Sequence, residues 1–409
     1  MEELEKNQEN QEIGEIITQA GQTTSTTSPR RIRSAAPATR AAEDIDSGIT
    51  KVTTQCEEAV SKIILKSIPS DSQITFVRFE GPNIALYTKN PKFALTDLTY
   101  FLSSLSKTLK KRFIIRTDPS SRLPEDQTRQ AVVKLLSKDV QVSAIFCDDA
   151  TGEVVLEVSK PEAIDPNMLV QIAQSTGWIA HTRRSPHIPS SSINTLHSTL
   201  KSSAKERTEF LQKLGKRVFR EPLIVSGVNG NDTAPSRQQQ ATTITTTTMT
   251  TSEPRSNKPQ SWSTSREEVM LFCLGGVKQV GRSCFVVVTP ETKVMLDCGI
   301  NPGEMSGVDA YPRLDWFNFD LDDLDAVVIS HAHIDHQGFL PTLFKYGYRG
   351  PVYCTEPTLP LMILLQTDSV KIANSNGTYL PYAARDVNEV IKHCITLPYG
   401  KPTDISPDV

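Results

Sequence analysis

A run late in the chain, SHAHIDHQGFLP from Ser330 to Pro341, constrains the fold more than any other feature of the sequence. Within this run, six consecutive residues contain four side chains of the types that bind metals. His331 and His333 alternate directly after an apolar segment, so both imidazoles can face one metal ion, while Asp335 and His336 continue the turn and can face a second. Such clustering would be costly in a protein core without an ion. The alternative interpretation is a histidine-rich surface loop.

The apolar patterns on either side of this run indicate alternating strands and helices, which is typical of an α/β layer architecture. The segment KVMLDCG is predicted to be a strand that ends at Asp297, next to the strand LDAVVIS that precedes the histidines. A carboxylate there can orient a liganding imidazole or brace the metal-bearing loop. An ordinary turn aspartate is the alternative. The other predicted strands are VMLFCLGG, SCFVVVT, PVYCT and ITLPYG, and the predicted helices are GFLPTLFKYG, TLPLMILLQTDSVKIA and VNEVIKHC.

The first half of the chain contains one pattern twice. From Val52 onward the apolar spacing predicts a helix, two strands, a helix and a strand, and the same order returns roughly 70 residues later. We interpret this as an internal duplication of a small α+β unit. The predicted modules are residues 51–122 and 123–225.

The second module ends in a basic segment. Residues 181–220 contain nine Lys or Arg against two Glu, whereas the whole chain has a formal charge of only -3. Any electrostatic attraction for nucleic acid must therefore be local. We expect RNA phosphates to be bound by the side chains of Arg183, Arg184, Lys213, Lys216 and Arg217.

The remaining segments have compositions that do not favour a packed core. Residues 1–50 are predicted to be a disordered tail, residues 226–265 a Thr-rich flexible linker, and residues 266–409 the third folded module. The acidic start lacks a targeting pattern, no apolar run could span a membrane, and the seven cysteines are scattered. A reduced, cytoplasmic protein is expected.

From about residue 270 onward the sequence resembles the metallo-β-lactamase fold. The segments LGGVKQVGRS, VMLDCGINPG, SHAHIDHQGFLP and GPVYCTEPT together resemble β-CASP nucleases, in particular the archaeal cleavage-and-polyadenylation-specificity-factor-like ribonucleases that terminate transcription. Those ribonucleases place two KH-type RNA-binding domains ahead of the nuclease, which matches the duplicated unit. The resemblance implies a multidomain α/β protein: duplicated α+β KH-like modules followed by the N-terminal half of a metallo-β-lactamase αββα fold.

The resemblance also implies an activity and a site. The expected activity is zinc-dependent endonucleolytic cleavage of RNA phosphodiester bonds in 3'-end formation and transcription termination. Of two zinc ions, His331 and His333 would hold the first, and Asp335 and His336 the second. Asp335 would also handle the proton of the attacking water, and Asp297 would support the loop. The implied partners are RNA, RNA polymerase and a second copy of the chain.

Two departures from the family pattern leave alternatives open. The KH-like modules lack a Gly-x-x-Gly loop, so RNA would be bound by the basic segment and strand faces, or the modules would serve as scaffolding. The family's later histidine and bridging aspartate ligands are missing before Val409, and His393 lies on a helical pattern typical of a packing or surface residue. We therefore expect a fragment or one half of a split nuclease.

Two other functions remain possible on the sequence. The chain could be a non-catalytic RNA-binding or assembly subunit that docks onto a partner carrying the missing half of the nuclease. It could instead be another metallo-β-lactamase-fold hydrolase, acting on a thioester or lactam, because this fold supports many chemistries.

Overall fold

The computed structural model describes residues 57–219, 244–245 and 269–409, apart from short gaps at residues 63, 67, 110, 137–139, 186, 189, 305–306, 317–319 and 407–408. The expected tail and nearly all of the expected Thr-rich linker lie outside the described residues. Among the described helices, none has the length and apolar character needed to cross a membrane.

The two N-terminal modules have the same sheet topology, as the predicted duplication requires. In each, the first two strands are antiparallel and the third is parallel to the second. A register irregularity falls at the same place in both copies, between Ile74 and Phe76 and between Val142 and Ala144. The strands are β1 (Ile74–Glu80), β2 (Asn83–Thr88) and β3 (Phe113–Thr117) in the first module, and β4 (Val142–Asp148), β5 (Glu153–Val158) and β6 (Ile179–Arg184) in the second.

The helices of the two modules differ where the capping chemistry differs. In the first module α3 (Pro91–Thr96) begins earlier than the apolar pattern predicts, because the Asn90 side chain accepts from the Phe93 amide at 3.3 Å and Pro91 opens the helix. In the second, Asp165 caps α6 (Pro166–Thr176). The other helices are residues 57–62 and 64–66, α4 (Leu98–Leu109) and α5 (Glu125–Leu135).

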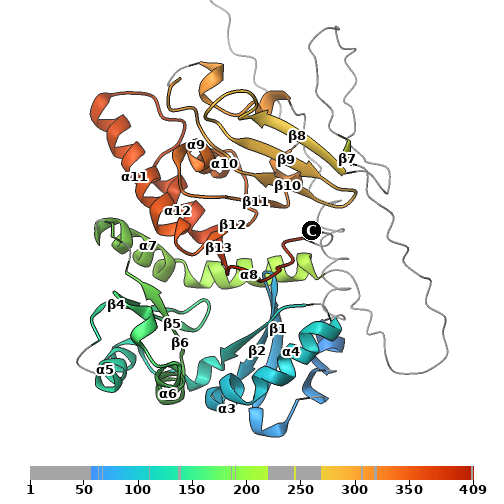
Figure 1. Ribbon diagram of the computed structural model, residues 1–409, viewed down its shortest axis with the longest axis vertical. Coiled ribbons are helices and arrows are strands. Elements are labelled where there is room, and N and C mark those ends of the chain that lie inside the picture. The colour runs from blue at the N-terminus through green and yellow to red at the C-terminus, as the bar shows by residue number, and fades with distance from the viewer. Residues whose placement is uncertain are drawn as a thin grey trace, which may run out of the picture. The chain divides into compact units, whose positions relative to one another are not determined.

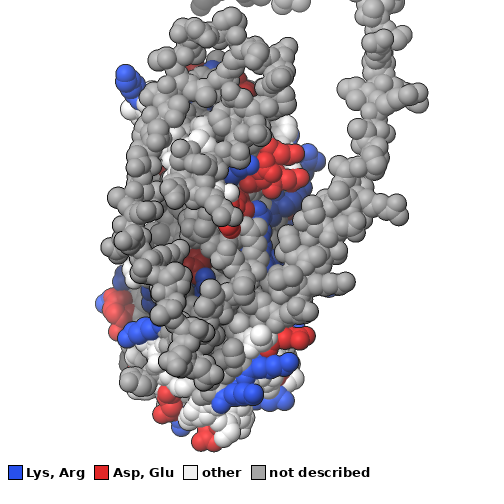
Figure 2. Space-filling model, turned by 90° about the vertical axis from the view of Figure 1, so that its right-hand side faces the viewer, with Lys and Arg blue, Asp and Glu red and all other residues white. Residues whose placement is uncertain are grey.

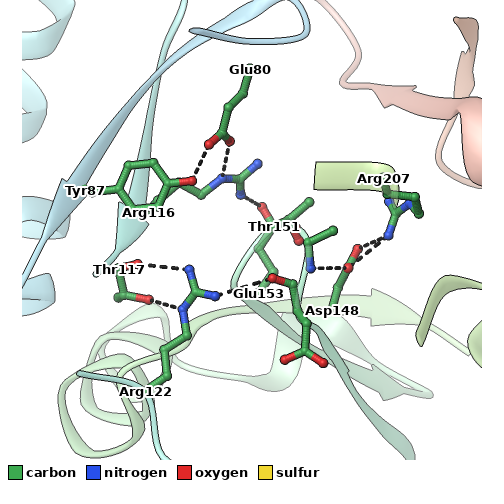
Figure 3. Close-up of polar contacts among 11 residues, drawn as sticks. Glu80, Tyr87, Arg116, Thr117, Arg122, Asp148, Thr151, Glu153 and Arg207 are labelled. Carbon is green, nitrogen blue, oxygen red and sulfur yellow. Dashed lines mark hydrogen bonds and ion pairs between the residues drawn. The ribbon is translucent and has the colours of Figure 1, made fainter. Parts of the chain in front are cut away.

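A buried ion-pair network joins the two modules (Figure 3). Arg116 on β3 bonds to Glu80 on β1 at 3.4 Å and to Glu153 on β5 of the second module, and Tyr87 donates to Glu80. The carboxylates raise the pKa of Arg116 despite its burial, which keeps the guanidinium charged. Arg116 and Glu80 are buried and Glu153 is half-buried, so the orientation of the modules is sensitive to the loss of any one of these charges.

The basic segment folds into the helices α7 (Ser190–Ser202) and α8 (Ala204–Val218). Their side chains contact the third module: Thr199 donates to Asn388 at 3.4 Å, and Arg217 forms an ion pair with Asp325. Part of the segment that was expected to bind RNA is therefore used for packing within the chain.

The third module is built on a seven-stranded sheet in the order β13-β12-β11-β10-β9-β8-β7 (Figure 1). Strands β10 to β13 are parallel to one another, and one face of the sheet contributes Met295, Val327 and Cys354 to a core shared with α10, α11 and α12. The strands are β7 (Ile244–Thr245), β8 (Val269–Gly275), β9 (Cys284–Val288), β10 (Lys293–Leu296), β11 (Ala326–Val328), β12 (Val352–Thr355) and β13 (Cys394–Leu397). The helices are α9 (Ile334–Gln337), α10 (Leu340–Lys345), α11 (Thr358–Asn376) and α12 (Ala384–His393).

These elements agree with the expected α/β architecture. One strand was not expected. Ile244 and Thr245, in the middle of the expected flexible linker, pair in parallel with Val269 and Met270 of β8. Isoleucine and threonine are β-branched and fit a pleated strand well, so these two residues can extend the sheet although the surrounding composition favours a linker.

Candidate metal centre

The histidine loop lies at the carboxyl ends of two parallel strands. Val294 to Leu296 of β10 pair in register with Ala326 to Val328 of β11, as the sequence predicts. Asp297 follows β10, and the segment from Ser330 to the short helix α9 follows β11. The strand pairing therefore brings Asp297 and the histidines to one edge of the sheet, although they are more than thirty residues apart in the chain.

Asp297 holds the loop through several hydrogen bonds. Its Oδ1 accepts from the Ser330 amide at 2.8 Å, and its Oδ2 accepts from the Ser330 hydroxyl at 2.9 Å and from His336 Nδ1 at 2.7 Å. The residue has a φ of 59°, which aspartate tolerates better than most residues, and it is only 7% exposed. The geometry thus accommodates both functions considered for this carboxylate, orienting an imidazole and bracing the loop.

Gly299 allows the segment after β10 to approach the histidine loop closely. The Cys298 amide donates to the His336 carbonyl at 2.7 Å, and the Ser283 amide donates to the Asp335 carbonyl at 2.8 Å. A Cβ atom on Gly299 would lie 1.7 Å from the Asp335 carbonyl oxygen, which is sterically impossible. The sequence shows this glycine only as the end of VMLDCG; its requirement follows from the contact in three dimensions.

The four expected ligands form two donor pairs. His331 Nε2 lies 3.1 Å from His333 Nδ1, and His336 Nε2 lies 3.6 Å from Asp335 Oδ2. Two donors on one tetrahedral zinc ion, with bonds of about 2.0 to 2.2 Å, are roughly 3.3 to 3.6 Å apart. The donor types suit zinc in both pairs; the separation of 3.6 Å lies within this range, and the separation of 3.1 Å is slightly shorter than two donors on one zinc ion would have.

Within the described residues, no group of three or more His, Cys, Asp or Glu side chains is arranged to hold a metal ion. Each pair thus supplies two donors, where a structural or catalytic zinc site takes at least three protein ligands. Burial, reinforced by the neighbouring imidazoles of His336 and His333, lowers the pKa of His331. A lowered pKa favours the neutral imidazole, which is the form that binds a metal.

An open pocket of about 310 Å³ adjoins the loop. His333 and Asp335 line one side of it, and Asp368 and Ser369 of α11 line the other. Sequence reasoning did not single out Asp368 or Ser369, because polar residues on a long helix carry no signal until the fold brings that helix beside the loop.

The side chains that were predicted to bind RNA do not form one uncompensated basic cluster. Arg183 forms an ion pair with Glu157, Arg184 pairs with Glu162 at 3.0 Å, and Arg217 pairs with Asp325. Acidic and basic side chains are also intermixed on the described surface that Figure 2 shows. Of the five predicted residues, Lys213 and Lys216 are the two for which no acidic partner is found in the described part of the chain; Lys213 is exposed and Lys216 half-buried.

His393, the other histidine considered in the sequence, is a packing residue at the end of α12. It is buried, its Nδ1 donates to the Glu389 carbonyl at 2.9 Å, and its ring contacts those of Phe210 and Phe344 at 4.7 and 5.1 Å. The structure therefore places it in the helical environment that its pattern predicts.

Comparison with known proteins identifies two domain types. A family model described as the KH domain of transcription termination factor FttA matches residues 54–122, and the metallo-β-lactamase superfamily model matches residues 277–360. The chain therefore combines a KH domain with a domain of the metallo-β-lactamase superfamily, whose fold implies metal binding. This agrees with the expected resemblance and fold class.

Relatives that match most of this chain share one name. The chain is 40% identical to transcription termination factor FttA of Cenarchaeum symbiosum over 350 residues, which cover 85% of this chain and 48% of that protein. It is 36% identical to the factor of the same name from Methanothermobacter thermautotrophicus over 355 residues, which cover 86% of this chain and 49% of that protein. Homologues of this chain are thus named transcription termination factor FttA, and the chain spans about half the length of these relatives.

A solved structure of the metallo-β-lactamase fold protein YhfI from Bacillus subtilis matches 32% of this chain and 46% of that chain, with 18% identity and a TM-score of 0.20. That score is too low to add to the sequence comparisons.

Proposed function

We propose that this chain supplies the histidine-loop side of a two-zinc site that cleaves RNA phosphodiester bonds endonucleolytically during transcription termination. The observation that carries the proposal is the pair of donor separations, 3.1 Å for His331 and His333 and 3.6 Å for Asp335 and His336. The names of the relatives support the biological setting, because they are transcription termination factors. RNA and RNA polymerase are the proposed partners, in the cytoplasm, with the chain acting as a dimer.

Each residue has a defined task in this proposal. His331 and His333 hold the first zinc ion, Asp335 and His336 hold the second, and Asp297 orients His336 and the loop. When bound, zinc supplies Lewis-acid chemistry that polarises a phosphoryl oxygen and makes water a stronger nucleophile. Asp335 accepts the proton that the attacking water loses, and the pocket beside His333 admits the RNA strand.

A second candidate function is a non-catalytic RNA-binding or assembly subunit. The observation that favours it is that each donor pair, within the described residues, lacks a third ligand. The two candidates differ in what happens when the missing ligands are supplied. A complete site requires donors from outside the described part of this chain in either case.

The deciding experiment combines this chain with the portion of the Cenarchaeum symbiosum relative that it does not span, as a fused or co-expressed polypeptide. A labelled single-stranded RNA is incubated with each preparation, and bound zinc is measured in parallel. We expect the chain alone to bind zinc weakly and to cleave little. The combined protein should bind two zinc ions and cleave.

Variants link any cleavage to the loop. His331→Ala, His333→Ala and Asp335→Ala should each abolish cleavage while RNA binding is retained. His187→Ala, an exposed histidine in the second module, is the matched control and should cleave normally. Full cleavage by His333→Ala would remove the loop from the mechanism, and zinc binding without cleavage by the combined protein would favour the assembly subunit.

A further inference from the structure

Two glutamines behind the histidine loop are completely buried. Gln337 ends α9 and Gln366 lies on α11, and both side chains are 0% exposed. Glutamine is rarely so buried unless its amide is hydrogen-bonded. Gln366 Nε2 donates to Gln337 Oε1 at 2.7 Å, and Gln337 Nε2 donates to the Ala332 carbonyl at 3.0 Å. The two amides therefore form a series of hydrogen bonds from α11 to the loop.

The Ala332 carbonyl, which is the last acceptor in this series, determines the donor and acceptor atoms of both amides. A backbone carbonyl can only accept, so Gln337 must present its NH₂ group to Ala332 and its oxygen to Gln366. Gln366 must then present its own NH₂ group to Gln337. Its remaining atom, Gln366 Oε1, is buried and has no hydrogen-bond partner among the described residues. The glutamine pair is thus held in one orientation by the Ala332 carbonyl.

The hydrogen bonds of the two glutamines end at Ala332, which lies where the first donor pair is formed. Ala332 is the single residue between His331 and His333, whose ring nitrogens lie 3.1 Å apart. Its carbonyl belongs to the peptide unit that leads into His333, so a hydrogen bond there limits rotation of the backbone that carries the imidazole. Asp297 braces the second pair through His336, whereas the two glutamine amides reach the first pair through the Ala332 carbonyl.

We propose that Gln337 and Gln366 are positioning residues that set the geometry of the His331–His333 pair and couple it to α11. The same helix carries Asp368 and Ser369 on the wall of the pocket, so one element places both the first donor pair and the surface facing it. This inference rests on the proposed zinc site, and neither glutamine touches the metal or the RNA.

The test is a double variant, Gln337→Met with Gln366→Met, in the protein that combines this chain with the portion of the relative that it does not span. Methionine has a similar length but cannot replace the hydrogen bonds, and removing both partners together leaves no half-satisfied amide. We expect the urea unfolding midpoint, measured with a chelator present, to change little. Zinc affinity, measured by competition with a chromophoric chelator, should fall about 10-fold, and the visible absorption of bound Co²⁺ should weaken or shift.

A matched control is Thr342→Val in the same module. It removes a buried hydroxyl that has no hydrogen-bond partner within the described residues. It should leave zinc affinity and the Co²⁺ spectrum unchanged. If the double variant does not fold, Gln337→Asn, which keeps the amide but is one methylene shorter, should show the same loss of affinity.

The outcomes separate the two proposals. Equal zinc affinity and identical Co²⁺ spectra in wild type and the double variant would overturn the positioning role while leaving the zinc site intact. Failure of the wild-type combined protein to bind either metal would overturn both. A loss of affinity as large in Thr342→Val would show a general loosening of the module, and the positioning role would then be wrong.

Discussion

His336 donates its Nδ1 proton to Asp297 Oδ2 at 2.7 Å, and this bond determines which ring nitrogen faces the candidate metal position. Because a carboxylate only accepts, Nδ1 must carry the proton. His336 Nε2 then has a free lone pair, and it is this atom that lies 3.6 Å from Asp335 Oδ2. The pairing of a liganding histidine with a carboxylate is common in metal sites, where it fixes the tautomer and ring orientation.

Replacing Asp297 with Asn should weaken zinc binding without unfolding the chain. Asparagine tolerates the positive φ of this position, but it cannot accept from Ser330 and His336 together. We expect zinc affinity to fall by about 10- to 100-fold. Chelator competition measures the affinity, and thermal unfolding in the metal-free state is the control. Unchanged zinc affinity would show that Asp297 only braces the backbone.

Replacing Gly299 with Ala should destabilise the third module. The new Cβ would meet the Asp335 carbonyl oxygen at 1.7 Å, so the segments after β10 and β11 would have to separate. We expect a loss of about 3 kcal/mol in the free energy of unfolding, measured in urea. Gly303→Ala is the control, because its nearest neighbour beyond the adjacent residues is the Asn301 side chain at 3.4 Å. Equal stability of the two variants would contradict the close approach.

The sequence predicts that the four candidate ligands lie in one loop and that β10 pairs with β11, because both depend on local patterns: alternating histidines, apolar runs and a carboxylate at a strand end. It does not predict Gln337, Gln366 or Asp368 as part of the site, since their relevance depends on where α11 packs. The sequence prediction for the basic segment has the same limit, because it also depends on how distant parts of the chain pack. Counting charges in residues 181–220 predicts an RNA surface, but the count cannot show that Arg217 meets Asp325.

Replacing Arg116 with Leu should destabilise the junction of the first two modules. Arg116 is the partner of Glu80, which is 4% exposed, and of Glu153, so its loss leaves two carboxylates without a counter-charge. We expect a loss of about 3 to 5 kcal/mol in the free energy of unfolding. Arg129→Leu removes a more exposed ion pair within α5 and should cost about 0.5 kcal/mol or less. Similar losses in both variants would mean that the junction is not desolvated.

RNA binding should depend on Lys213 and Lys216 more than on the paired arginines. Replacing both lysines with Glu should weaken binding to a labelled single-stranded RNA. It should also reduce the dependence of affinity on salt, by about 0.7 in the logarithmic slope for each phosphate that the variant no longer binds. Lys134→Glu combined with Lys160→Glu, two exposed lysines of the second module, controls for the change in net charge. Binding that is insensitive to salt, or an equal weakening in the control, would remove this surface of α8 from RNA recognition.

His393 should make the stability of the chain depend on pH in the mildly acidic range. Burial lowers the pKa of this imidazole, with the Arg349 charge acting in the same direction and the contacts to Glu389 and the charge of Glu206 opposing it. In the unfolded chain a histidine titrates near ~6.5, so below that pH the unfolded state binds more protons than the folded state. The stabilisation from neutral His393 is therefore complete above about pH 6.5 and is lost as the pH falls through the folded-state value.

The pH dependence of His393 is tested by measuring the free energy of unfolding in urea at several pH values for wild type and His393→Leu. The variant also loses the hydrogen bond to Glu389, so its absolute stability is expected to differ, and the informative quantity is the slope with pH. A shallower slope below about pH 6.5 in His393→Leu is the expected result. Parallel curves would mean that His393 is not held neutral between Phe210 and Phe344, because a histidine that titrates alike in both states adds nothing to the slope.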